Sequence, residues 1–364
     1  MKSLKSFLIW GIVVLVGLAS FTTLALSRDE HVSAIWMVTA AISVYCIAYR
    51  FYSLYIANRV MQLDPNRLTP AERHNDGLDY VPTHKGVLFG HHFAAIAGAG
   101  PLVGPVLAAQ MGYLPGTLWI IFGVVFAGAV QDMMVLFVSM RRDGKSLGDI
   151  VKQELGTVPG VIASIGILMI MVIIMAVLAL IVVKALVHSP WGTFTIAATM
   201  PIALFMGIYT RYIRPGKIGE ISIVGFILLM LAVIYGEDVA HSSFGHWFDL
   251  DGIQLTWAIM IYGFVASVLP VWLLLTPRDY LSTFLKIGTI AALALGIVIV
   301  NPTLQMPAVT HFIDGSGPVF SGALFPFLFI TIACGAVSGF HALISSGTTP
   351  KMVENETHVR MIGY

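Results

Sequence analysis

The chain has 364 residues, of which 57% are hydrophobic and 11% are charged, and its formal net charge is +1. Soluble domains carry roughly 25% charged residues, so this composition excludes an ordinary soluble globular protein. The balanced charge also gives no reason to expect a nucleic-acid partner. Long apolar runs recur along the chain, and about 20 apolar residues cross a bilayer as a helix. We therefore predict an all-α, polytopic membrane protein embedded in a lipid bilayer.

Ten apolar segments are long enough to be membrane spans, and we expect them to form one transmembrane domain over residues 1–364. Their approximate ranges are 7–26, 33–57, 92–111, 116–139, 161–184, 193–212, 218–235, 255–275, 281–300 and 321–345. No cleavage site follows the first segment, so we expect it to be retained. With both termini cytoplasmic, every lysine and arginine except Arg28 and Lys184 falls on the cytoplasmic side. Cytoplasmic loops are enriched in these residues, which supports the orientation.

Motifs for metal or cofactor chemistry are absent from the sequence. The two cysteines, Cys46 and Cys334, lie in predicted spans and support neither a disulfide framework nor a metal site. No HExxH or GxSxG motif occurs. We expect no cofactor other than a coupling ion.

The third span contains the sequence GAGPLVGP at residues 98–105. Proline lacks an N–H and clashes with a carbonyl one turn earlier, and glycine permits backbone angles that other residues resist. We predict a break in this helix near mid-membrane, either buried in protein or lining a cavity. Transporters bind solutes and ions at such breaks. The candidate substrate-binding residues of this segment are Gly98, Gly100, Pro101, Leu102, Val103 and Gly104.

The N–H groups of Leu102 and Val103 are the candidate donors to a substrate carboxylate. A helix N-terminus carries roughly half a positive charge, which favours an anion there. The alternative is that these glycines and prolines only kink the helix or allow close packing against a neighbour.

The eighth span contains Ser267 and Pro270, and we predict that Pro270 breaks it. The third and eighth spans are five apart and cross in opposite directions, as in a five-plus-five inverted repeat with its site at the repeat interface. Ser267 and Pro270 are therefore further candidate substrate-binding residues. Arg278 and Asp279, which follow them, are expected to form a local ion pair.

The tenth span carries polar residues at helical spacing, so they are expected to share one face of a continuous helix. They are Thr331, Cys334, Ser338, His341 and Ser345. This face either hydrogen-bonds to a neighbouring helix or lines the solute path, where Ser338 is the candidate substrate contact. The unperturbed pKa of histidine, about 6.5, makes His341 a candidate for proton coupling.

Asp132 lies in the inner half of the fourth span. An acid inside a membrane segment is a functional candidate by default, so Asp132 is the second candidate for proton coupling. The alternative is an interfacial acid that faces Arg141 or Arg142. Asp132 and His341 come from different spans, and the sequence does not determine whether they touch. The adjacent His91 and His92 point to different sides of a helix, so a shared metal is not expected.

Three long blocks resemble the carbon starvation protein A family. They are FGHHFAAIAGAGPLVGPVLAAQMGYLPGTLW (89–119), PVWLLLTPRDYLSTFLKIG (270–288) and PFLFITIACGAVSGFHALISSGTTPK (326–351). The resemblance covers essentially the whole chain. It implies a transporter of the bacterial inner membrane with a five-plus-five inverted-repeat fold. Family members extend well beyond position 364, so the chain is expected to be an N-terminal fragment.

The resemblance also implies a function, namely uptake of peptides or pyruvate as small-molecule substrates, with a proton as the coupling ion and a link to carbon starvation. The physical reading of the spans independently favours a secondary active transporter. Two alternatives are a membrane nutrient sensor that binds without transport and an intramembrane enzyme that uses His341 or Asp132. The choice between peptide and pyruvate, the choice between proton and sodium, and the oligomeric state stay open.

Overall fold

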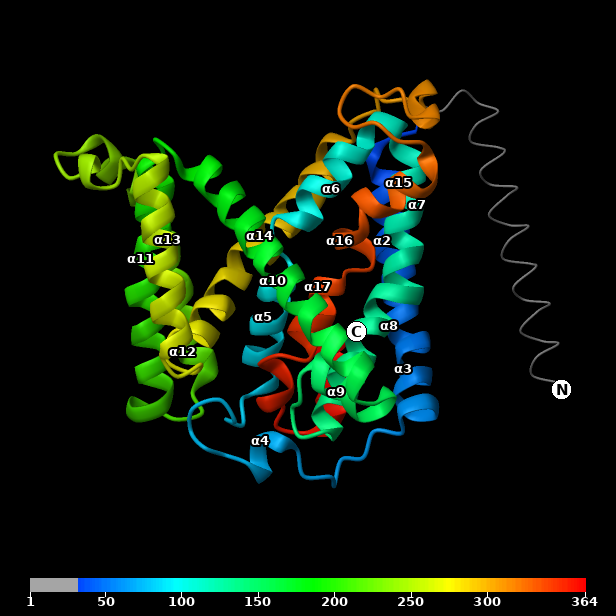
Figure 1. Ribbon diagram of the computed structural model, residues 1–364. Coiled ribbons are helices and arrows are strands. Elements are labelled where there is room, and N and C mark those ends of the chain that lie inside the picture. The colour runs from blue at the N-terminus through cyan, green and yellow to red at the C-terminus, as the bar shows by residue number, and fades with distance from the viewer. Residues whose placement is uncertain (1–31) are drawn as a thin grey trace, which may run out of the picture.

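The computed structural model describes residues 32–364, and over this range the protein is all-α, which confirms the predicted fold class (Figure 1). The extended pairings in this range are the isolated bridges Ser33–Thr303 and Thr83–Val353. The first predicted span, 7–26, lies outside the described residues.

Six described helices are long and apolar enough to cross a membrane. They are Ala34–Met61, Tyr113–Arg141, Thr157–Leu186, Pro190–Ile213, Ile218–His241 and Leu275–Val300. They cover the second, fourth, fifth, sixth, seventh and ninth predicted segments and extend beyond most of them by a few residues. Their elements are α2 (Ala34–Ile47), η1 (Ala48–Tyr52), α3 (Ser53–Tyr55), η2 (Ile56–Met61), α7 (Tyr113–Gly123), η4 (Val124–Gly128), α8 (Ala129–Arg141), α10 (Thr157–Leu186), α11 (Pro190–Ile208), η5 (Tyr209–Ile213), α12 (Ile218–His241) and α14 (Leu275–Val300).

Short helices occupy the connections between these spans. They are α4 (Pro70–Arg73), α9 (Leu147–Leu155), η6 (Gly245–Trp247), η7 (His311–Asp314), η8 (Thr349–Lys351), η9 (Glu356–His358) and α18 (Val359–Gly363). In Figure 1, α4 and α9 lie at one end of the molecule, whereas residues 242–251 and 301–323 lie at the opposite end. The first end carries the loops rich in lysine and arginine, so the structure is compatible with the predicted orientation.

The third span is a bent pair of helices, as its glycines and prolines predicted. Helix α5 (Lys85–Ile96) and helix α6 (Gly100–Ala108), which continues through η3 (Ala109–Met111), meet at 44°. Residues 97–99 between them are not helical, and Ala97 has a ψ of 63°. Pro101 stands at the start of α6, where its missing N–H leaves no intrahelical bond unmade.

The eighth span differs from the prediction. Helix α13 (Gly252–Val268) ends before Pro270, and Leu269 is extended. The residue before a proline is disfavoured in the helical region, so Pro270 ends this helix instead of breaking it internally. The chain turns through residues 270–274, and α14 starts at Leu275, earlier than position 281. Pro277 fits there because the first turn of a helix tolerates proline.

The tenth span is not one helix, so the predicted polar face of a continuous helix is wrong. It consists of α15 (Leu324–Thr331), α16 (Ala333–Ala336) and α17 (Gly339–Ser345). Val337 and Ser338 between α16 and α17 are extended, with φ values of −144° and −106°. Two extended residues change the direction in which the following side chains project. The third and tenth spans are therefore both broken.

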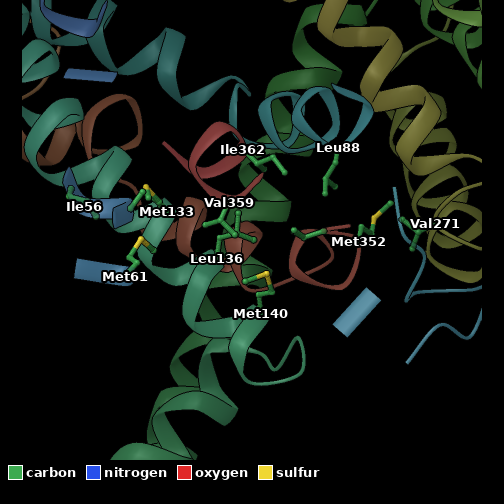
Figure 2. Packing of buried hydrophobic residues seen from close by; sticks show 12 residues of the cluster. Ile56, Met61, Leu88, Met133, Leu136, Met140, Val271, Met352, Val359 and Ile362 are labelled. Atoms are coloured by element: carbon green, nitrogen blue, oxygen red, sulfur yellow. The ribbon is translucent and has the colours of Figure 1, made fainter. Parts of the chain in front are cut away.

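A hydrophobic cluster surrounds α8 at the end of the molecule that carries α4 and α9, which we call the loop-rich end. Figure 2 shows Met133, Leu136 and Met140 of α8 near Val359 and Ile362 of α18, with Leu88 of α5 and Met352 alongside. All of these side chains are buried. This packing fixes α8 and α5 against the segment that follows α17, and so it positions the polar residues described next.

Candidate functional site

Asp132 and His341 touch in the folded protein. His341 Nδ1 lies 3.1 Å from Asp132 Oδ2, and this contact joins α8 to α17. The two residues are only 6% and 8% exposed. Arg141 and Arg142 have other partners, Glu356 and Glu154, so the alternative in which Asp132 faces one of these arginines is wrong. The structure brings together the two titratable residues that the sequence had selected separately.

The break in the tenth span orients His341. Ser338 caps α17, because its Oγ accepts a hydrogen bond of 3.2 Å from Phe340 N. The Ser338 carbonyl in turn accepts a hydrogen bond of 2.6 Å from Gln131 Nε2, and Gln131 precedes Asp132 on α8. The backbone carbonyl of Ser338 therefore holds the start of α17 against the turn of α8 that contains Asp132. His341 Nε2 is buried without a hydrogen-bond partner among the described residues, which leaves a polar atom free at this site.

The two histidines of α5 add polar contacts that the sequence did not predict. His92 Nδ1 lies 2.9 Å from Thr349 Oγ1, and His91 Nε2 lies 3.0 Å from Thr348 Oγ1. His91 Nδ1 also lies 2.9 Å from Asp279 Oδ2. As expected, the two rings face different partners. The described residues, 32–364, contain no group of three metal-binding side chains.

The predicted ion pair between Arg278 and Asp279 is wrong. Asp279 contacts His91, whereas the Arg278 guanidinium lies 4.6 Å from the centre of the Tyr262 ring. Because α14 begins at Leu275, both residues sit in its first turns and project from different sides of the helix.

A polar stripe on α14 follows α5 toward the break. Beyond Asp279, Thr283 Oγ1 donates to the Gly90 carbonyl at 2.7 Å, and Lys286 Nζ donates to the Ala94 carbonyl at 2.6 Å. The sequence map had assigned Lys286 to the cytoplasmic side, but it lies within the apolar helix α14. A search for charged residues inside the predicted span 281–300 would have found it.

The glycines of α6 allow close packing against the tenth span, which was the structural alternative. A Cβ at Gly100 would lie 2.6 Å from Cys334 Sγ, and one at Gly104 would lie 2.5 Å from the Thr331 carbonyl. A Cβ at Gly98 would meet nothing within 4 Å. Gly98 therefore borders open space, whereas Gly100 and Gly104 are contact positions.

Leu102 and Val103 do not offer free amides. Their N–H groups donate to the Ala99 carbonyl at 3.1 and 3.0 Å, and their side chains are 73% and 39% exposed. The two candidate donors therefore already have an acceptor within α6 in this structure, and their role in binding a carboxylate stays a prediction.

Ser267 and Pro270 lie away from this cluster. Ser267 is exposed on α13 and its Oγ donates to its own helix at Phe264 O, while Pro270 lies in the connection to α14. Helix α13 packs mainly on α10, and α6 packs on α15 and α16. The broken third span is thus paired with the tenth span and not with the eighth, contrary to the prediction.

Two cavities lie among these helices, one near each end of the molecule. One of about 370 Å³ at the loop-rich end is lined by residues that include His84, Arg211 and Tyr280. Another of about 190 Å³ lies near the opposite end, against Pro105 of α6 and Ile332 at the break between α15 and α16.

Comparisons with known proteins place these features in a family. A model of the carbon starvation protein CstA family matches residues 33–364. The chain is 66% identical over 365 residues to the peptide transporter CstA of Escherichia coli K12 and 63% identical over 364 residues to the pyruvate/proton symporter BtsT of the same strain. Both matches cover 100% of this chain, but only 52% and 51% of those relatives.

A more distant relative gives the same result. The peptide transporter CstA of Bacillus subtilis is 48% identical over 332 residues, which is 91% of this chain and 55% of that protein. No solved structure matches the chain. The chain spans about half the length of the curated relatives that it matches. Since the family model covers nearly all of the described residues, with the broken third span and the segment around Asp132 and His341 inside the match, the chain belongs to the carbon starvation protein CstA family.

Proposed function

We propose that this chain forms the solute path of a secondary active transporter of the bacterial inner membrane, which takes up a peptide or pyruvate together with a proton. The relatives, a peptide transporter and a pyruvate/proton symporter, support transport over catalysis. The identities of 66% and 63% are too similar to favour one of the two substrates.

The observation that carries this proposal is the buried contact between Asp132 on the continuous fourth span and His341 on the broken tenth span. Its atoms are 3.1 Å apart and belong to α8 and α17, and α17 exists as a separate short helix because of the break at Val337 and Ser338. Discontinuous helices near mid-membrane are the sites at which secondary transporters bind solutes and ions.

Proton coupling follows from the chemistry of this pair. A pair made of a carboxylate and an imidazole can hold either one or two protons, and the net charge of the pair differs between these two states. A buried charge is costly in a membrane protein, so a change in the protonation of the pair changes which packing of α8 and α17 is favoured. This gives an ion gradient a means to drive a conformational change.

The experiment uses Asp132→Asn and His341→Gln in the protein expressed from its complete reading frame. In proteoliposomes with an imposed pH gradient, at least one of these variants is expected to lose accumulation of pyruvate or a dipeptide. Counterflow exchange, which needs no gradient, is expected to persist within about threefold of the unsubstituted protein.

Matched controls are Asp238→Asn and His246→Gln, which change exposed residues near the far end of the molecule. Both are expected to accumulate substrate normally. Unchanged proton-driven accumulation in both Asp132→Asn and His341→Gln would refute the coupling role. Absence of exchange for every peptide and for pyruvate in the unsubstituted protein would refute transport and favour a sensor.

A further inference from the structure

The feature with no assigned role is a lysine inside a membrane helix. Lys286 is half-buried within α14, a helix of 26 residues that is apolar enough to span a bilayer. Lysine in such a helix is rare, faces the protein interior or a wet cavity, and marks a solute or ion path by default. Lys286 fits this description because its ammonium points at α5 and not at lipid.

The ammonium reaches a carbonyl that the helix break has released. In an unbroken helix the Ala94 carbonyl would accept from Gly98 N, but Gly98 N donates to Ile96 O at 2.8 Å instead. The Ala94 carbonyl accepts from Lys286 Nζ at 2.6 Å in its place. The positive charge is thereby held at the C-terminal end of α5, next to the break, where the helix dipole favours a cation.

Lys286 forms no ion pair with an acidic side chain among residues 32–364. No described Asp or Glu oxygen lies within 4.0 Å of its Nζ, and Asp279, two turns earlier on the same helix face, contacts His91. A carbonyl oxygen stabilises an ammonium but does not neutralise it. A cation that is partly removed from bulk water and has no ion-pair partner is stabilised when an anion binds to it.

We propose that the Lys286 ammonium binds the carboxylate of the transported solute. This inference rests on the proposed function and specifies how the solute is recognised. A carboxylate is the group that pyruvate and the C-terminus of a peptide share, so one cation serves either substrate. At the break itself, nothing lies within 4 Å of the Cβ position of Gly98, four residues after Ala94, so no other side chain covers the bend there.

A purely structural role predicts a different outcome, because a capping lysine could be replaced by any hydrogen-bond donor. Lys286→Gln keeps an N–H group that can reach the Ala94 carbonyl but removes the charge, and Lys286→Arg keeps the charge. Lys184→Gln is the matched control, since Lys184 is exposed in the last turn of α10.

The measurement is the half-saturating concentration in counterflow for four compounds: pyruvate, its neutral amide, a dipeptide, and the same dipeptide with an amidated C-terminus. Lys286→Gln is expected to raise the value for the accepted acid by about tenfold or more, since a charge-assisted hydrogen bond is lost. The value for the matching amide should change by less than about threefold. Lys286→Arg and Lys184→Gln should retain the preference for the acid.

The ratio between acid and amide separates recognition from structure. If Lys286→Gln changes both values by the same factor, or changes neither, the inference is wrong while transport stands. If the unsubstituted protein exchanges none of the four compounds, the proposed function fails and the inference fails with it. The acid that the unsubstituted protein accepts also decides between the keto acid and the peptide.

Discussion

Two adjacent arginines at the end of α8 hold acidic partners in very different surroundings. Arg141 donates to Glu356 Oε1 from Nε at 3.2 Å and from Nη2 at 2.5 Å, and the Glu356 side chain is 1% exposed. Arg142 pairs with Glu154, whose side chain is 50% exposed. Removing one partner of a buried ion pair leaves an uncompensated charge, whereas an exposed pair contributes little.

We therefore expect Arg141→Met to lower the free energy of unfolding by about 3 kcal/mol. Arg142→Met should lower it by less than about 1 kcal/mol. Thermal unfolding of the two purified variants in the same detergent measures the difference. Equal midpoints for the two variants would show that the Glu356 carboxylate finds other partners, such as Arg67, whose Nε lies 3.6 Å from its Oε2.

The sequence identified some site residues and missed others for a clear physical reason. Asp132 and His341 could be selected because they are titratable groups within long apolar segments. Lys286 was missed although the predicted ninth span, 281–300, contains it, because it lies near the start of that span and was counted with the cytoplasmic lysines and arginines. The partner of Asp279 could not be predicted, since His91 lies far away in the sequence and meets it only through the packing of α5 on α14.

The contact between α6 and the tenth span depends on the absence of side chains. Gly104 faces the Thr331 carbonyl so closely that a Cβ would lie 2.5 Å from it, whereas the Cβ position of Gly98 is open. Alanine is favoured over glycine in a helix by up to about 1 kcal/mol, but forcing an extra carbon into a packed contact costs about 1–3 kcal/mol.

Gly104→Ala is therefore expected to destabilise the protein by about 1–2 kcal/mol. Gly98→Ala, its matched control, should stay within about 0.5 kcal/mol of the parent protein. The thermal unfolding midpoint in detergent tests both substitutions. A Gly104→Ala protein as stable as Gly98→Ala would mean that α6 and α15 separate readily at this point.

The broken helices were predicted with unequal success, because only one carries its signal locally. Gly98 and Pro101 lie at the break in the third span and predict it from the local sequence. No proline lies between Thr331 and Gly339, so the breaks in the tenth span depend on tertiary contacts such as the hydrogen bond from Gln131 to the Ser338 carbonyl. Pro270 was correctly identified as incompatible with a helix but ends α13 instead of bending it.

The arrangement of the whole molecule relative to the membrane can be tested with three exposed positions. Ser242 and Ser316 lie in the connections at one end, and Asn75 lies in the loop that contains α4 at the other. In a background without Cys46 and Cys334, single cysteines at Ser242 and Ser316 are expected to react with an impermeant thiol reagent in intact cells. A cysteine at Asn75 should react only after the cells are opened. The reverse pattern would invert the topology.

For the whole molecule, the composition was sufficient to predict the fold class but not to predict which spans pack against each other. Few charges and long apolar runs predict a bundle of membrane helices. Which helices touch depends on the shapes of the side chains, so the third span was paired with the eighth by position in the chain, although α6 packs on the tenth. The five-plus-five inverted repeat stays a prediction.

The two halves of the third span are attached to different neighbours. Helix α5 is bonded to α14 through Thr283 and Lys286, whereas α6 lies against the tenth span at Gly100 and Gly104. In mechanical terms these are two levers with a common pivot at residues 97–99. Since α17 packs on α5 whereas α15 and α16 pack on α6, a rotation about the pivot would move α15 and α16 with α6 and leave α14 and α17 with α5. Displacement would be smallest at the pivot itself, so a solute bound at the site proposed beside Lys286 would stay nearly stationary while access changes on either side of it.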